Sequence, residues 1–136
     1  MIKKPQITKD VIRKALLQEF ETFLYKNKIH FEKEVMYKKL FDTKRQFRAD
    51  YVLYKIKNGV INELFITVEI NGGQFINGRH TRGGKGYEND LQKINLAQRN
   101  DYKVFQYTYE MLQRREYLED FMQIINLKLI QINQNN

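Results

Sequence analysis

Two consecutive runs of β-branched and aromatic residues, joined by an Asn-Gly pair, constrain the fold of this chain more than any other feature. The first run is Phe47–Ile56, the second is Val60–Ile70, and the link is Lys57-Asn58-Gly59. Because Asn and Gly both tolerate a positive φ, this pair between two strand patterns is the strongest short signal for a two-residue turn. The sequence therefore predicts an antiparallel hairpin built from these two runs.

Patterns on either side of the hairpin predict the remaining elements. A helix from about Thr8 to Lys28 and a strand near Glu34–Leu40 precede it. After it we expect a glycine-rich segment and then, in order, a helix Tyr87–Arg99, a strand Lys103–Thr108 and a last helix over about 109–131 that Thr108 caps. A hairpin followed by a helical crossover to another strand predicts an α/β (α+β) fold, with a mixed central sheet flanked by helices.

The length and composition limit the class of protein. A chain of 136 residues suits one domain, which we expect to span 1–136 with its core over about 8–110. Cysteine is absent, which excludes disulfides and thiolate metal sites. No apolar run approaches the ~18 residues that suggest a membrane span, and the start MIKKPQITKD lacks the apolar stretch of a secretory signal. We expect a cytoplasmic protein with no membrane partner.

The chain is basic, and its positive charge is concentrated in two segments. Lys and Arg number 24 against 16 Asp and Glu, giving a formal net charge of +8. Residues 1–48 hold 13 basic and 6 acidic side chains, and residues 72–99 hold 5 and 2. Such a field attracts polyanions, of which nucleic acid is the commonest. A solubilising lysine surface would give the same counts, so charge alone leaves both readings open.

Two carboxylates occupy positions in the hairpin where strands seldom carry them. Asp50 lies inside the first strand, Glu69 lies near the end of the second, and Asn71 shares the face of Glu69. Two carboxylates on neighbouring strands repel each other unless a cation or a proton lies between them. Strand carboxylates suit Mg²⁺, which keeps several waters and leaves room for a phosphate. Alternatively, each faces solvent or pairs with a nearby Lys or Arg.

The first helix carries a carboxylate on its apolar side. Its expected apolar stripe consists of Ile12, Ala15, Leu16, Phe20, Phe23 and Leu24. Glu19 falls in the middle of this stripe, whereas Glu21 falls on the opposite, wet side. A carboxylate on a buried face needs a partner or a metal. Glu19 could also reach the rim of the face or bond a buried tyrosine.

The glycine-rich segment combines backbone access with positive charge. It holds six of the seven glycines, interleaved with four basic or imidazole side chains: Arg79, His80, Arg82 and Lys85. Glycines let backbone amides approach phosphates closely, and the basic side chains supply charge. The pattern GxxxxGK[ST] is absent, so we do not expect an NTPase. A surface loop without a ligand is the alternative.

At this point the motifs resemble a known family. They are RADYV at 48–52, VEINGG at 68–73, GRHTRGGKGY at 78–87, Asp90 with Lys93, Asn95 and Ala97 on the next helix, and VFQYT at 104–108. Together they resemble the PD-(D/E)XK nucleases, and most closely the small phage and prophage nucleases of the VRR-NUC and Holliday-junction-resolvase-like groups. The resemblance covers roughly residues 30–110, with the helix that carries Glu19 in front. It implies a restriction-endonuclease-like αβββαβ core plus a C-terminal helix.

The resemblance implies roles for the matching positions only. Asp50 and Glu69 would be metal ligands, joined by the carbonyl of Ile70 and by Glu19 from the helix. Asn71 occupies the lysine position of the motif, which is a departure, because a neutral amide cannot stabilise a developing charge as an ammonium does.

Lys93 is the candidate for the missing positive charge. On the helix 87–99 we expect Tyr87, Leu91 and Gln98 to face the sheet, with Lys93 and Asp90 on the flank. The lysine stem could lie along the sheet while its ammonium reaches a phosphate. An ordinary ion pair with Asp90 is the alternative.

The function that the resemblance implies is a metal-dependent DNA endonuclease. Mg²⁺ would be the cofactor, Mn²⁺ would substitute, and DNA would be held by Arg79, His80, Arg82, Lys85 and Arg48. Two alternatives remain open: a Holliday-junction resolvase specifically, and a DNA-binding module that has lost catalysis, which Asn71 motivates.

We also expect a homodimer, because one domain offers one active site and cutting two strands needs two. The last helix is the candidate interface, through Phe121, Ile124, Ile125 and Leu129. The competing prediction is that this helix packs on its own sheet.

Overall fold

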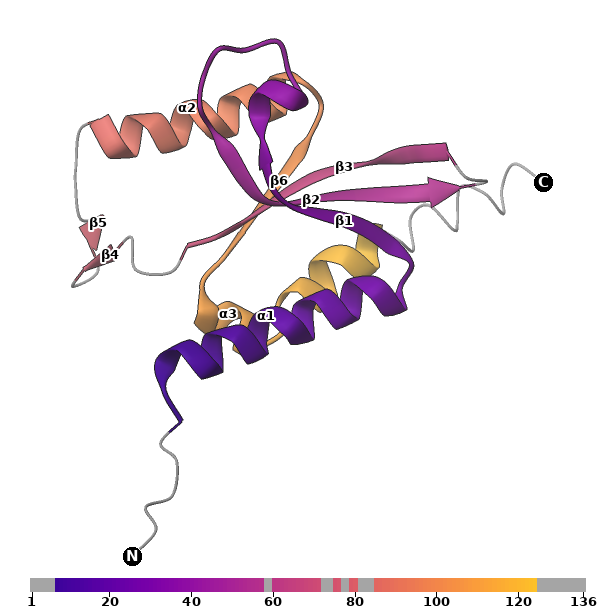
Figure 1. Ribbon diagram of the computed structural model, residues 1–136, viewed down its shortest axis with the longest axis vertical. Coiled ribbons are helices and arrows are strands. Elements are labelled where there is room, and N and C mark those ends of the chain that lie inside the picture. The colour runs from indigo at the N-terminus through magenta and orange to yellow at the C-terminus, as the bar shows by residue number, and fades with distance from the viewer. Residues whose placement is uncertain (1–6, 58–59, 72–74, 77–78, 81–84, 125–136) are drawn as a thin grey trace, which may run out of the picture.

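The computed structural model describes residues 7–57, 60–71, 75–76, 79–80 and 85–124 of the chain (Figure 1). Its helices and strands are α1 Lys9–Lys26, β1 Ile29–Met36, the 3₁₀ helix η1 Tyr37–Lys39, β2 Arg48–Lys57, β3 Val60–Ile70, β4 Phe75–Ile76, β5 Arg79–His80, α2 Lys85–Arg99, β6 Lys103–Tyr107 and α3 Tyr109–Gln113. A further helix covers 117–124. None of the helices in this part of the chain is long and apolar enough to cross a membrane.

The central element is a four-stranded mixed sheet in the order β1-β2-β3-β6. β1, β2 and β3 pair antiparallel, and β6 lies parallel to β3. Lys57 at the end of β2 pairs with Val60 at the start of β3, which leaves two residues for the turn. The predicted hairpin and the predicted α/β fold class are therefore confirmed.

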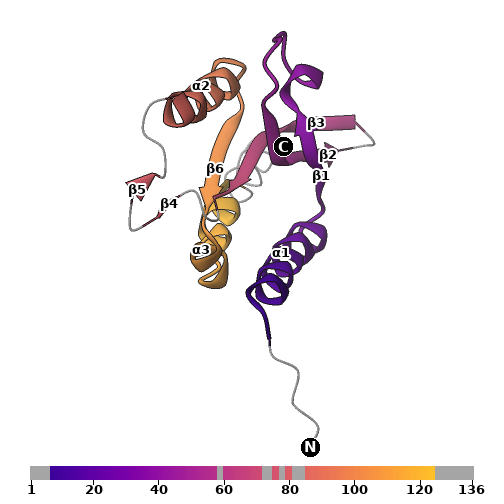
Figure 2. The ribbon, with the colours of Figure 1, turned by 60° about the vertical axis from the view of Figure 1, so that its left-hand side comes forward.

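The helices cover both faces of this sheet. α1 and α3 lie on one face and α2 on the other, in both ribbon views (Figures 1 and 2). Under α1 and α3, the ring of Phe20 meets those of Tyr51 and Tyr117 edge-on, at 5.4 and 5.0 Å between centroids. The cluster under α2 contains Val52 and Ala97. Since Tyr51 and Val52 are consecutive, β2 sends alternate side chains to opposite faces, and Asp50 shares the α2 face with Val52.

The first strand begins earlier than the sequence predicts. The expected strand Glu34–Leu40 is found at Ile29–Met36, and η1 occupies 37–39. Within the sheet that the structure describes, β1 is an edge strand paired with β2, and its charged side chains are exposed. Charged residues are typical of edge strands and hide their apolar alternation in the sequence.

Glu34 in β1 has a left-handed backbone conformation, with φ of 53°. The other left-handed residues of the described chain are Lys28, Asp101 and Arg115, and each follows the end of a helix, where this conformation is common. Glu34 is the exception, because it lies inside a strand.

The helix α2 turns a different face to the sheet from the one predicted. Tyr87 and Leu91 were expected to face the sheet, but they are 52% and 42% exposed. Leu96 and Ala97 are buried instead, and the side chain of Lys93 is largely covered. The apolar stripe misleads here because the buried face of α2 also carries the side chain of Lys93, which belongs to the candidate site.

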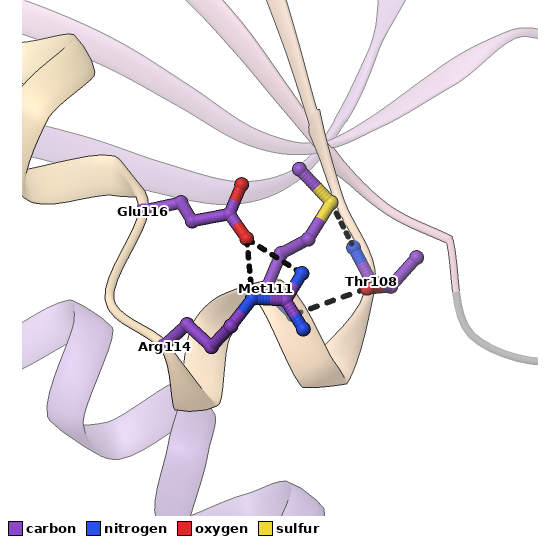
Figure 3. Close-up of polar contacts among 4 residues, drawn as sticks. All are labelled: Thr108, Met111, Arg114 and Glu116. Atoms are coloured by element: carbon purple, nitrogen blue, oxygen red, sulfur yellow. Dashed lines mark hydrogen bonds and ion pairs between the residues drawn. The ribbon is translucent and has the colours of Figure 1, made fainter.

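The chain after β6 begins with a well-defined cap (Figure 3). The Thr108 hydroxyl accepts a hydrogen bond from the Met111 N–H at 3.1 Å, and the Thr108 N–H donates to the Met111 sulfur at 3.4 Å. The helix predicted over 109–131 is not continuous: it ends at Gln113, and a turn at 114–116 with Arg115 at φ 55° separates it from the helix 117–124. Thr108 is thus confirmed as the cap, whereas the single long helix was wrong.

The helix 117–124 packs on its own sheet. Phe121 is 2% exposed, and its ring lies 5.3 Å from that of Phe105 in β6. Ile124 is partly buried against the same cluster. Phe121 is therefore not free to form a dimer interface, while Ile125 and Leu129 lie outside the described residues.

Candidate active site

The carboxylates of Asp50 and Glu69 come together on the α2 face of the sheet. Tyr51 of β2 lies opposite Val68 of β3, so the next cross-strand pair toward this end of the sheet is Asp50 and Glu69. One Asp50 oxygen accepts a hydrogen bond from the Ile70 N–H at 2.7 Å. This bond orients the Asp50 carboxylate toward β3.

Glu69 is largely buried, and the negatively charged carboxylate of Asp50 lies beside it. The pKa of Glu69 is raised to about 7: burial raises it most, the Lys93 ammonium lowers it in part, and the Asp50 carboxylate raises it. A carboxyl with such a pKa holds a proton that a cation between the two groups would replace.

Lys93 reaches this pair from α2. Its ammonium nitrogen lies 2.6 Å from Glu69 Oε1, and the two side chains are 19% and 13% exposed. The same nitrogen stands 5.6 Å from the centre of the Tyr37 ring, within range of a cation–π contact. The structure thus brings the Lys93 ammonium to the carboxylate pair. The expected position of the lysine stem along the sheet allows this contact.

Ile70 and Asn71 complete the end of β3. The N–H and the carbonyl of an extended residue point toward the same neighbouring strand. Because the Ile70 N–H points toward Asp50 of β2, the Ile70 carbonyl points toward β2 as well. The Asn71 N–H points the other way, to the Tyr107 carbonyl at 2.8 Å. The Asn71 side-chain amide donates to Gln106 Oε1 at 2.6 Å.

Gln106 is a site residue that the sequence motifs do not predict. It lies opposite Glu69 in the parallel pairing of β3 with β6. Its signal in the sequence was weak but real, because it is the one polar residue between apolar neighbours in VFQY. Met36 and Gln46 were missed as well, and no motif marks them.

A depression of about 400 Å³ opens over these groups. Its lining consists of Met36, Gln46, Arg48, Asp50, Glu69, Ile70 and Lys93. Gln46 and Arg48 are exposed, so the depression is reachable from solvent. Arg48 therefore lies beside the carboxylate pair. Its expected contact with DNA stays a prediction.

Glu19 is not brought to this site. It is ion-paired with Arg115 and its side chain is 40% exposed, on the helix that covers the opposite face of the sheet. Glu21, expected on the wet side, accepts a hydrogen bond from the buried Tyr51 hydroxyl at 2.8 Å and pairs with Lys33 at 2.8 Å. The tyrosine contact considered for Glu19 is thus made by Glu21, because the helix is rotated relative to the predicted stripe and Ile12 at its start is 47% exposed.

The glycine-rich segment connects the site's two halves along the chain, from the end of β3 to the start of α2. Within it β4 pairs with β5, with Phe75 opposite His80 and Ile76 opposite Arg79. Arg82 and the side chains of Arg79, His80 and Lys85 lie outside the described part of the structure, so their predicted phosphate contacts stay predictions.

The donor set fits a hard cation that keeps much of its water. Within the described ranges, no group of three or more His, Cys, Asp or Glu side chains comes together. Mg²⁺ commonly uses one or two carboxylates and completes its octahedron with waters and substrate phosphate oxygens. Asp50 and Glu69, with the Ile70 carbonyl on the same side, meet that requirement.

The chain matches no known family model, no curated protein and no solved structure. The geometry of this site and the motifs that its residues form therefore carry the functional interpretation.

Proposed function

We propose that this protein is a metal-dependent DNA endonuclease that hydrolyses phosphodiester bonds at the Asp50–Glu69 pair. The observation that carries the proposal is the meeting of two strand carboxylates with the Lys93 ammonium, 2.6 Å from Glu69, in a depression open to solvent. Two carboxylates and an ammonium on three different elements are costly to bury together, so their meeting here favours a chemical role.

Asp50 and Glu69 would hold the cation, and the Ile70 carbonyl would add a third protein oxygen. A bound Mg²⁺ or Mn²⁺ would lower the pKa of a coordinated water and offset the charge of the scissile phosphate. Ionisation of Glu69 is the step that prepares this site, because its pKa of about 7 leaves it half protonated near neutral pH.

Lys93 and Arg48 would act on the phosphate itself. With a cation beside Glu69, the Lys93 ammonium can turn from that carboxylate to an oxygen of the phosphate. Arg48 offers a guanidinium at the edge of the same depression. Asn71, held by Gln106, carries no charge, and its role is limited to orienting water or a phosphate oxygen.

The net charge of +8 supports a polyanionic substrate. A second candidate, a DNA-binding module without catalysis, is favoured by one observation: the amide of Asn71 stands where an ammonium would be expected and is already bonded to Gln106.

A cleavage assay separates these functions. Plasmid DNA and a four-way junction are incubated with the protein in Mg²⁺, in Mn²⁺ or in EDTA, together with Asp50→Ala and Glu69→Ala. We expect cleavage with either metal, none in EDTA, and none by the two variants, which should still bind DNA in EDTA. Preference for the junction would indicate a resolvase. Binding without cleavage by the wild type would favour the inactive module, and cleavage by either variant at the wild-type rate would refute the site.

A further inference from the structure

A second, smaller pocket of about 280 Å³ adjoins the carboxylate site. It lies between the loop that precedes β2 and one side of α2, and it is lined by Thr43, Arg45, Phe47, Gln92, Asn95, Leu96 and Arg99. Phe47 and Gln92 directly precede Arg48 and Lys93, which line the depression over Asp50 and Glu69. The two hollows are therefore neighbours along both β2 and α2.

Arg45 is fixed in this pocket by uncharged groups. Its two terminal nitrogens donate to Gln92 Oε1 at 2.7 Å and to Asn89 Oδ1 at 2.9 Å. Its guanidinium carbon lies 4.2 Å from the centre of the Phe47 ring. Amide oxygens and an aromatic face orient a guanidinium without neutralising it.

The pocket brings together two guanidinium groups, those of Arg45 and Arg99. Among the residues that the structure describes, neither Arg45 nor Arg99 pairs with a carboxylate. A guanidinium has five N–H donors, and the two bonds of Arg45 leave three of them for a ligand. If Arg45 served only to link the loop to α2, a carboxylate at position 89 or 92 would bind it more strongly than an amide does. Amide partners instead leave the positive charge of Arg45 available to a ligand.

We propose that Arg45 and Arg99 bind a backbone phosphate of the substrate nucleic acid, next to the phosphate held at Asp50 and Glu69. The nucleic acid would then run along the side of α2 that carries Asn89, Gln92 and Arg99. This inference rests on the proposed function, and it adds a phosphate site that the family motifs do not include.

The test is the salt dependence of duplex DNA binding in EDTA, where no cleavage occurs. The variants are Arg45→Gln and Arg99→Gln, with Lys14→Gln as a control that removes one charge from an exposed position on α1, across the sheet. Each lost phosphate contact should make the negative slope of log K against log salt shallower by about 0.9, and the control should leave it unchanged.

Arg45→Lys separates charge from structure, because it keeps the charge and loses the two amide bonds. We expect it to retain the wild-type slope. A purely structural Arg45 would instead give Arg45→Lys and Arg45→Gln the same loss of thermal stability and no change of slope. If Arg45→Gln does not fold, Arg99→Gln decides, since the Arg99 side chain makes no hydrogen bond or ion pair with the described residues.

Slopes for both glutamine variants equal to that of Lys14→Gln would overturn the inference, as would a wild-type protein that does not bind DNA. Unchanged slopes with normal cleavage by the wild type would remove this phosphate site and leave the endonuclease intact. Shallower slopes for the glutamine variants, with no cleavage by the wild type in any metal, would support the phosphate site and refute the endonuclease.

Discussion

At the scale of single residues, the environment of Glu69 sets how the protein responds to pH. Burial and the nearby Asp50 carboxylate stabilise its protonated form, and Lys93 opposes them without cancelling them. The raised pKa thus follows from two acids and one ammonium that share a largely covered space.

The first prediction concerns stability against pH in EDTA. Because the pKa of Glu69 rises from 4.5 to about 7 on folding, the folded protein keeps a proton that the unfolded chain has released between these values. The contribution of Glu69 is fully present below pH 4.5 and is lost as pH rises through 7, by up to about 3 kcal/mol. Urea unfolding of wild type and Glu69→Gln at a series of pH values measures it: their difference should change across this window, and a constant difference would contradict the raised pKa.

The second prediction concerns Lys93→Met, which keeps the stem and removes the charge. Because Lys93 lowers the pKa of Glu69, the pH range over which stability falls should move upward in this variant. The single-turnover cleavage rate should fall by ~10²-fold, the scale of losing one transition-state donor. Lys93→Arg, which keeps a cation, serves as the control. A rate for Lys93→Met within about threefold of wild type would show that Lys93 only balances the charge of Glu69.

At the scale of elements, the sheet and the helix α2 differ in how far their sequences reveal them. The hairpin was predictable because both of its signals are local: the Asn-Gly turn and two long strand patterns. The buried face of α2 was not, since Lys93 lies on it and Ala97 is small, while the larger Tyr87 and Leu91 are exposed. Periodicity finds apolar faces, so it fails where a buried face carries a polar site.

The residues of the candidate site likewise differ in how well the sequence predicts them. Asp50 and Glu69 were predictable because carboxylates are unusual inside strands. Glu19 and Glu21 were not assigned correctly, because they differ by two positions on one helix and only the packing of α1 decides which of them meets Tyr51. The partnership of Gln106 with Asn71 depends on the parallel pairing of β3 and β6, which no local pattern encodes.

The third prediction belongs to β1, where Glu34 holds a left-handed conformation. Glycine removes the roughly 1–2 kcal/mol cost of that conformation but loosens the unfolded chain, so Glu34→Gly should raise the free energy of unfolding by roughly 0.5–1 kcal/mol. Glu32→Gly is the matched control, an exposed glutamate of the same strand whose φ is not positive. It should lower stability by roughly 0.5–1 kcal/mol. Equal losses in both variants would contradict the strain at Glu34.

At the scale of the whole molecule, the fourth prediction is that the active form is a homodimer. Cutting both strands of a duplex needs two sites, and a two-fold dimer supplies them. Phe121 cannot supply the interface, because it is buried in its own core. Sedimentation at micromolar concentration should show a species of twice the 16.5 kDa chain mass. A fully active monomer would refute the dimer and leave the site unaffected.

The two faces of the sheet carry different kinds of side chain. α1, α3 and the helix 117–124 close an aromatic core on one side, including the Glu21–Tyr51 bond. On the other side, α2 and the loop before β2 surround the carboxylate pair and the Arg45 pocket. Substitutions on the first face should therefore change stability alone, whereas those on the second should also change ligand binding.

The most direct test of this division, and of the site, is the affinity for Mn²⁺ measured by isothermal titration calorimetry at pH 8. The proteins compared are wild type, Asp50→Asn, Glu69→Gln and Glu19→Gln, the last being the same kind of substitution on the opposite face. We predict that the two site variants bind at least about tenfold more weakly than wild type, whereas Glu19→Gln binds equally well. Wild-type affinity in Asp50→Asn and Glu69→Gln, or a loss confined to Glu19→Gln, would contradict the account.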